Sequence, residues 1–247
     1  MIHLTSDGAV STIAIDRPKR RNAVDGEALD GLFEAIGSVA PAGDGRCRAM
    51  VLTGSGGHFC AGADLSTLED IAFATRLRQV LFAIRDLPIP VIAAVGGAAL
   101  GAGTQLAAVC DLRVAAPDAT FGIPANRLGV AVDHWTIQRL TLDWGFGPAR
   151  AMLVGGQTFT GEDAQRVGFV HRIATDPLAA AQEWAGELAQ RAPLTMATHK
   201  LGLARLEREV GTDPPFQRAW RQVWASADVA EGVAAFGEKR PPRFEGR

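Results

Sequence analysis

The chain has 247 residues, of which 47% are hydrophobic, so it is long enough to bury the core of one full domain. Its formal net charge of −2 excludes attraction to nucleic acid or to a membrane surface through overall charge. The first residues lack the basic and apolar runs of a signal peptide, and the three cysteines lack metal-ligand spacing. We therefore predict a cytoplasmic protein with no metal, no nucleic-acid partner and no membrane-spanning segment.

The first predicted strand covers residues 9–15, which are rich in β-branched side chains. Four cations follow it closely: Arg17, Lys19, Arg20 and Arg21. Guanidinium and ammonium groups donate hydrogen bonds to phosphate oxygens, so this cluster is a candidate site for a phosphorylated ligand. The alternative is a solvated surface loop.

A helix is predicted over residues 25–39, where apolar side chains recur at helical spacing, and a buried strand over residues 48–54. The strand runs into a turn of small residues, 55–65, and then into a further helix. His58 lies in this turn, where a structural histidine is the more common interpretation than a catalytic one.

A second turn of the same kind follows a predicted strand at 91–95 and precedes a helix at 102–110 and a strand at 111–116. Its glycines, at 96, 97, 101 and 103, allow sharp bends and close approach of backbone. The first N–H groups of a helix have no partner within it, so this turn can present donors to a ligand. The alternatives are a core turn without a ligand and a membrane helix, which the prolines and flanking aspartates disfavour.

Both turns carry a resemblance to the enoyl-CoA hydratase/isomerase (crotonase) superfamily. Its motifs lie at Phe59–Leu65 and Pro90–Gly103, and the similarity extends over nearly the whole chain to Phe236–Arg240. The resemblance implies an α/β fold, a ClpP-like spiral of β-β-α units, over residues 1–190. A helical trimerisation region would follow over residues 191–247, giving a homotrimer or hexamer.

The resemblance also implies that the backbone N–H groups of Ala63 and Ala102 form an oxyanion hole for the thioester of an acyl-CoA. One such donor can contribute about 3–4 kcal/mol to an oxyanionic transition state. Position 102 is usually glycine in the family, and a Cβ there would cost roughly 1–2 kcal/mol if φ were positive. Coenzyme A is expected as part of the ligand, with no other cofactor. The positions that match CoA-binding residues of the family are Arg17, Lys19, Arg20, Arg21, Ala61, Asp64, Leu65, Phe236 and Lys239.

The sequence departs from the family at the catalytic positions. Family hydratases carry glutamates where this chain has Gln105 and Ala125. Adding water to a double bond needs a base for the water and an acid for the α-carbon, each worth about 10²–10⁴-fold. Neither an amide nor a methyl group exchanges a proton near neutral pH, so efficient hydration is not expected.

Asp133 matches a working aspartate of dienoyl-CoA isomerases and of some dehalogenases in the family. Its alternative role is an N-cap for a helix that begins near His134 or Trp135. These two residues, with Gln105 and Ala125, are expected to line the acyl pocket. Beyond residue 145 the chain is predicted to be mostly helical, with a capping pair at Thr160 and Asp163 and a strand at 169–173.

Two functional hypotheses follow. In the first, the chain resembles a catalytically silent branch linked to fatty acid and mycolic acid metabolism, and it binds long-chain fatty acyl-CoA. In the second, it is an active enzyme of the superfamily (a dienoyl-CoA isomerase, thioester hydrolase or hydratase) that uses Asp133.

Overall fold

The computed structural model describes residues 1–39, 47–65, 71–206 and 214–245. Within these ranges the main sheet has the strand order β1-β2-β3-β4-β6-β9. The β1–β2 pair is antiparallel and the other pairs of this sheet are parallel. The strands are β1 (Ile2–Asp7), β2 (Val10–Ile15), β3 (Ala49–Gly54), β4 (Val91–Val95), β6 (Leu112–Ala115) and β9 (Arg172–Ile173).

A smaller sheet continues from the carboxyl end of β4. It consists of β5 (Ala98–Leu100), β7 (Thr120–Gly122) and β8 (Phe159–Thr160), in that order. The chain passes from one sheet to the other at Gly97, whose φ is +47°. A Cβ at Gly97 would stand 2.5 Å from the Gly57 carbonyl oxygen, so the turn needs glycine to pass the neighbouring loop. Strands β4 and β5 with helix α3 therefore form one β-β-α unit.

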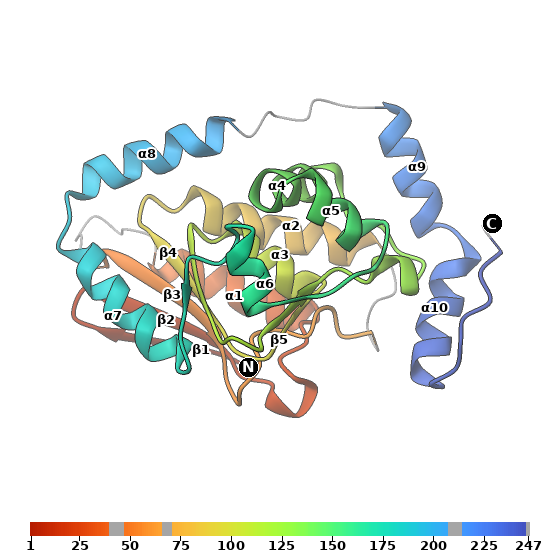
Figure 1. Ribbon diagram of the computed structural model, residues 1–247, viewed down its shortest axis with the longest axis horizontal. Coiled ribbons are helices and arrows are strands. Elements are labelled where there is room, and N and C mark those ends of the chain that lie inside the picture. The colour runs from red at the N-terminus through yellow and green to blue at the C-terminus, as the bar shows by residue number, and fades with distance from the viewer. Residues whose placement is uncertain (40–46, 66–70, 207–213, 246–247) are drawn as a thin grey trace.

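Helices cover both faces of the main sheet (Figure 1). On one face, Ala181 and Ala185 of α7 pack in a cluster with Val51 and Ile92. On the other face, α1, α2 and α3 contribute to the larger core. The helices are η1 (Pro18–Arg20), α1 (Gly26–Val39), α2 (Ile71–Asp86), α3 (Ala102–Val109), η2 (Ala125–Arg127), α4 (His134–Trp144), α5 (Phe146–Leu153), α6 (Gly161–Arg166), α7 (Pro177–Ala189), α8 (Pro193–Leu206), α9 (Pro214–Trp224) and α10 (Ala227–Gly237).

The C-terminal helices lie at opposite ends of the molecule: α8 near α7, and α9 with α10 on the far side (Figure 1). Lys200 anchors α8 through a 2.7 Å ion pair with Asp111 and a 3.0 Å hydrogen bond to the Ile89 carbonyl. The predicted boundary between residues 190 and 191 falls between α7 and α8. The division into two domains stays a prediction, and residues 207–213 and 246–247 of the second part lie outside the described residues.

Most predicted elements agree with the structure to within one or two residues. The strand expected over 169–173 is shorter, because the N–H groups of Phe169 and Val170 bond to the Ala164 carbonyl of α6 and only Arg172–Ile173 pairs with β6. The capping pair is confirmed, since Thr160 and Asp163 form a reciprocal capping box at the start of α6. Among the described residues, no helix combines the length and the apolar character needed to cross a membrane.

Candidate ligand site

A cavity of about 860 Å³ lies between the two small-residue turns, α2 and the C-terminal helices. It contains most of the residues that the sequence singled out, from four distant parts of the chain. Those that line it are Lys19, Arg20, Arg21, Ala61, Ala63, Asp64, Leu65, Ala102, Gln105, Ala125, Asp133 and Phe236.

The two turns meet through their backbones. Cys60 forms a parallel bridge with Ala99, and its N–H and carbonyl bond to Ala98 and Leu100, each at 2.9 Å. Gly62 and Gly101, which precede the two predicted donors, both have positive φ, at +111° and +54°. A Cβ on Gly62 would stand 3.0 Å from the Leu100 carbonyl oxygen, so glycine at this position lets the two turns lie side by side.

The Ala63 N–H is turned away from its nearest strand neighbour. Ala63 forms a parallel bridge with Val24, in which the Val24 N–H bonds to the Gly62 carbonyl and the Asp64 N–H to the Val24 carbonyl. In an extended chain successive N–H groups point to opposite sides, so the Ala63 N–H points away from Val24. No group in the part of the chain that the structure describes accepts a hydrogen bond from it.

Ala102 is the first residue of α3, and its N–H likewise has no acceptor among the described residues. The strain considered for a Cβ at this position does not arise. The left-handed residue is Gly101, whereas Ala102 is not among the described residues with positive φ. Ala102 thus keeps a donor at the positive end of the α3 dipole.

Gln105 lies one helical turn beyond Ala102 and also lines the cavity. Its side-chain oxygen accepts a 2.9 Å hydrogen bond from the Thr136 hydroxyl. Ala125 lines the cavity at the start of η2. The two positions that would hold glutamates in a hydratase thus face the same space as the backbone donors.

Asp133 caps α4, so the capping interpretation is confirmed. Its Oδ1 accepts a 2.8 Å hydrogen bond from the Thr136 N–H, and its backbone is extended, as an N-cap requires. The other oxygen, Oδ2, lies 3.6 Å from a guanidinium nitrogen of Arg78. The carboxylate borders the cavity while both of its oxygens have protein partners.

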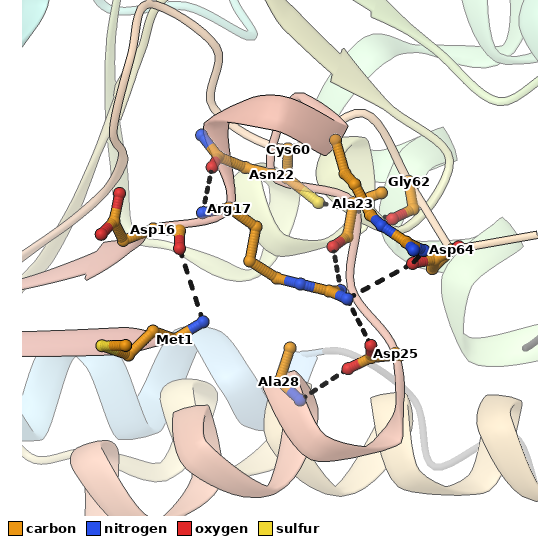
Figure 2. A network of polar contacts seen from close by, with 11 residues as sticks. Met1, Asp16, Arg17, Asn22, Ala23, Asp25, Ala28, Cys60, Gly62 and Asp64 are labelled. Carbon is orange, nitrogen blue, oxygen red and sulfur yellow. Dashed lines mark hydrogen bonds and ion pairs between the residues drawn. The ribbon is translucent and has the colours of Figure 1, made fainter.

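The basic segment divides into two parts. Lys19, Arg20 and Arg21 line the cavity and are exposed, as a phosphate site requires. Arg17 does not line it. Its guanidinium is directed at Asp25, Asp64 and the Ala23 carbonyl (Figure 2).

Three other expected site residues lie away from the cavity lining. The Trp135 ring is buried, with its centroid 5.1 Å from that of Phe82, and His134 is the first residue of α4. Helical geometry explains the difference, because residues adjacent to the cap point to other faces of the helix. Lys239 follows α10 in a left-handed conformation, φ +54°, outside the lining.

Of the lining that comes from the C-terminal helices, the sequence identified Phe236 but not Trp224, Val233 or Gly237. Both Trp220 and Trp224 donate their indole N–H to the Ala131 carbonyl, at 3.0 and 3.1 Å. Gly232 of α10 allows close packing, since a Cβ there would stand 2.3 Å from the Leu128 carbonyl oxygen. These contacts hold α9 and α10 beside the cavity of their own chain, which Phe236 of α10 lines. Trp220 and Trp224, four residues apart in the sequence, were the signal that could have predicted this packing.

The described part of the site contains neither a thiolate nor a group of metal ligands. Burial raises the pKa of the Cys60 thiol to about 12, so this cysteine stays protonated at neutral pH. Among the residues that the structure describes, no three His, Cys, Asp or Glu side chains are grouped as metal ligands. His58 has the structural role expected of it, since its Nδ1 accepts a 3.0 Å hydrogen bond from the Ala98 N–H.

Fold and site together define a class of protein: a spiral of β-β-α units whose cavity presents backbone donors from two adjacent turns. The sequence pattern of the enoyl-CoA hydratase/isomerase family matches residues 5–247. The chain belongs to this family, and its fold is the crotonase fold that the resemblance implied.

Individual relatives agree with this assignment. The chain is 44% identical over 254 residues to the "Probable enoyl-CoA hydratase echA6" of Mycobacterium tuberculosis, covering 100% of both chains. It is 32% identical over 248 residues to the short-chain-enoyl-CoA hydratase of Clostridium acetobutylicum, covering 96% of this chain and 94% of the relative. A solved structure of methylmalonyl-CoA decarboxylase in complex with 2-nitronate-propionyl-CoA superposes with a TM-score of 0.90 at 26% identity, covering 100% of this chain and 98% of that one.

Proposed function

We propose that this protein binds fatty acyl-CoA, with the thioester oxygen between the N–H groups of Ala63 and Ala102, and does not hydrate it. The observation that carries the proposal is a pair of donors from adjacent turns at the wall of one cavity, neither of which has an acceptor in the described ranges. Lys19, Arg20 and Arg21 lie at the same cavity, where they can contact the CoA phosphates.

The lining supports a fatty acyl group. Apolar side chains from α2, the segment after β7 and α10 form much of the cavity wall, and the volume is that of a typical small-molecule site. Each further buried methylene should add about 0.8 kcal/mol of binding free energy until the cavity is filled. The apolar lining residues include Leu65, Leu77, Leu81, Leu100, Ile123, Leu128, Val130, Val132, Trp224, Val233 and Phe236.

The absence of hydration rests on Gln105 and Ala125. Both face the cavity, so the space where a hydratase needs its acid and base holds an amide and a methyl group. Assembly as a trimer or hexamer is part of the same proposal. Its support is a pair of exposed leucines, Leu194 and Leu201, which lie seven residues apart and so on the same face of α8.

Calorimetry tests the binding proposal. A fatty acyl-CoA should bind at least about tenfold more tightly than the free acid of the same chain length, because the acid lacks the CoA phosphates. Raising the salt concentration should weaken acyl-CoA binding and leave binding of the acid nearly unchanged. Equal affinity for both ligands would contradict the CoA assignment.

Substitution of Asp133 distinguishes a binding protein, in which this residue only caps α4, from an enzyme that uses its carboxylate. Asp133→Asn keeps the capping oxygen, so we expect little change in stability, whereas Asp133→Ala should lower the free energy of unfolding by about 1 kcal/mol. Acyl-CoA affinity should be nearly the same in the Asn variant and the wild type. A dienoyl-CoA isomerase or thioesterase activity in the wild type that falls at least about 10²-fold in Asp133→Asn would instead establish an enzyme.

A further inference from the structure

Arg17 is held by three partners beneath the cavity wall. Its guanidinium donates to the Ala23 carbonyl at 2.6 Å and pairs with Asp25 at 2.5 Å and Asp64 at 3.3 Å. The side chains of Arg17, Asp25 and Asp64 are only 18%, 17% and 8% exposed. Charge-assisted contacts at such partly buried sites are stronger and less screened than surface ion pairs. Figure 2 shows all three partners directed at the same guanidinium.

These partners surround the bridge that orients Ala63. Ala23 and Asp25 flank Val24, and Asp64 follows Ala63, so the guanidinium ties both sides of the Val24–Ala63 bridge together. Asp25 is itself fixed, since its Oδ1 accepts a 2.9 Å hydrogen bond from the Ala28 N–H of α1.

The backbone of Arg17 is also fixed. Its N–H donates to the side-chain oxygen of Asn22 at 2.8 Å. Asn22 is fully buried, and its amide group donates to the carbonyls of Ser55 and His58 at 2.8 and 2.6 Å. Arg17 is thus connected to the turn that carries Ala63 through its backbone, by way of Asn22, and through its guanidinium, which pairs with Asp64.

We infer that Arg17, with Asp25 and Asp64, is a positioning network that aims the Ala63 N–H at the thioester oxygen. This inference rests on the proposed function and changes the role expected of Arg17, which is no longer a phosphate contact. Arg20, which also pairs with Asp64, links the network to the cations at the cavity. The planar fork of arginine suits three partners, a geometry that a lysine cannot reproduce.

The test uses an acyl-CoA labelled with ¹³C at the thioester carbonyl, whose infrared frequency falls when the oxygen accepts hydrogen bonds. In the wild type, binding should lower this frequency. In Arg17→Met the shift should become markedly smaller, and acyl-CoA affinity should fall about three- to tenfold. Affinity for free CoA, which has no thioester, should stay within about twofold.

Two further variants complete the test: a second disruption of the network and a matched control. Asp25→Asn preserves the oxygen that caps α1 while it removes the ion pair, so it should reproduce the smaller shift even if Arg17→Met fails to fold. Asp30→Asn is the matched control, because it breaks the 2.6 Å Asp30–Arg76 pair, and neither residue lines the cavity. The control should keep the wild-type shift.

Two results would overturn the inference. An unchanged carbonyl shift in the folded variants would leave Arg17 with a purely structural role, and an equal loss of affinity for free CoA would make it a phosphate contact. If the wild type binds acyl-CoA and shifts its carbonyl, the proposed function stands in both cases. A wild type that does not bind acyl-CoA would overturn both proposals.

Discussion

Restoring both glutamates, as Gln105→Glu with Ala125→Glu, is expected to raise hydration of crotonyl-CoA at least about 10²-fold above either single variant. The two groups act as a unit, one activating water and the other protonating the α-carbon, so neither is sufficient alone. The site can accept the first change. A carboxylate at position 105 can take the hydrogen bond that Thr136 now donates to the glutamine oxygen. Position 125 already faces the cavity.

The measurement is the loss of enoyl-CoA absorbance with time. Gln105→Leu is the control, because it fills the same space without an ionisable group and should show no gain. The wild type should show negligible turnover. A wild-type rate on the order of 10 s⁻¹ would mean that another acid–base pair performs the reaction, and the proposal of a binding protein would be wrong.

Gly103→Ala is expected to lower the free energy of unfolding by about 3 kcal/mol or more. Gly103 is buried in the first turn of α3, and a Cβ there would stand 2.0 Å from the Cys60 carbonyl oxygen. That oxygen belongs to backbone bonded to Leu100, so relieving the overlap means separating the two turns. The same displacement should reduce acyl-CoA binding.

Equilibrium unfolding in urea measures the stability change. Gly186→Ala provides the control, since Gly186 lies within α7 and a Cβ there would meet no atom within 4 Å. That variant should be about 0.5–1 kcal/mol more stable than the wild type, because alanine favours the helix. Equal stability of the two variants would contradict the packing described for the turns.

The sequence predicted the elements around the site because their signals are local. The apolar runs at 48–54 and 91–95 predict buried strands, and the glycines indicate the turns that follow them. The candidate donors came from the resemblance, and the structure places both at one cavity. Asp133 was left open between two roles, and its contact with the Thr136 N–H, three residues away, identifies the cap.

Other features depend on contacts between distant parts of the chain. The pairing of Asp64 with Arg17 spans 47 positions, and that of Trp220 with the Ala131 carbonyl spans 89. Composition and periodicity contain no signal for such contacts. The cations at residues 17–21 were therefore all predicted to contact phosphate, although the guanidinium of Arg17 pairs with carboxylates instead.

A structure of the protein with a bound fatty acyl-CoA tests the central claim most directly. We predict that the thioester oxygen lies about 2.7–3.1 Å from the backbone nitrogens of both Ala63 and Ala102. The acyl chain should lie along the apolar lining, with no carboxyl or imidazole group within hydrogen-bonding distance of its second and third carbons. A thioester oxygen bound elsewhere, or a carboxylate such as that of Asp133 placed at either carbon, would contradict the account.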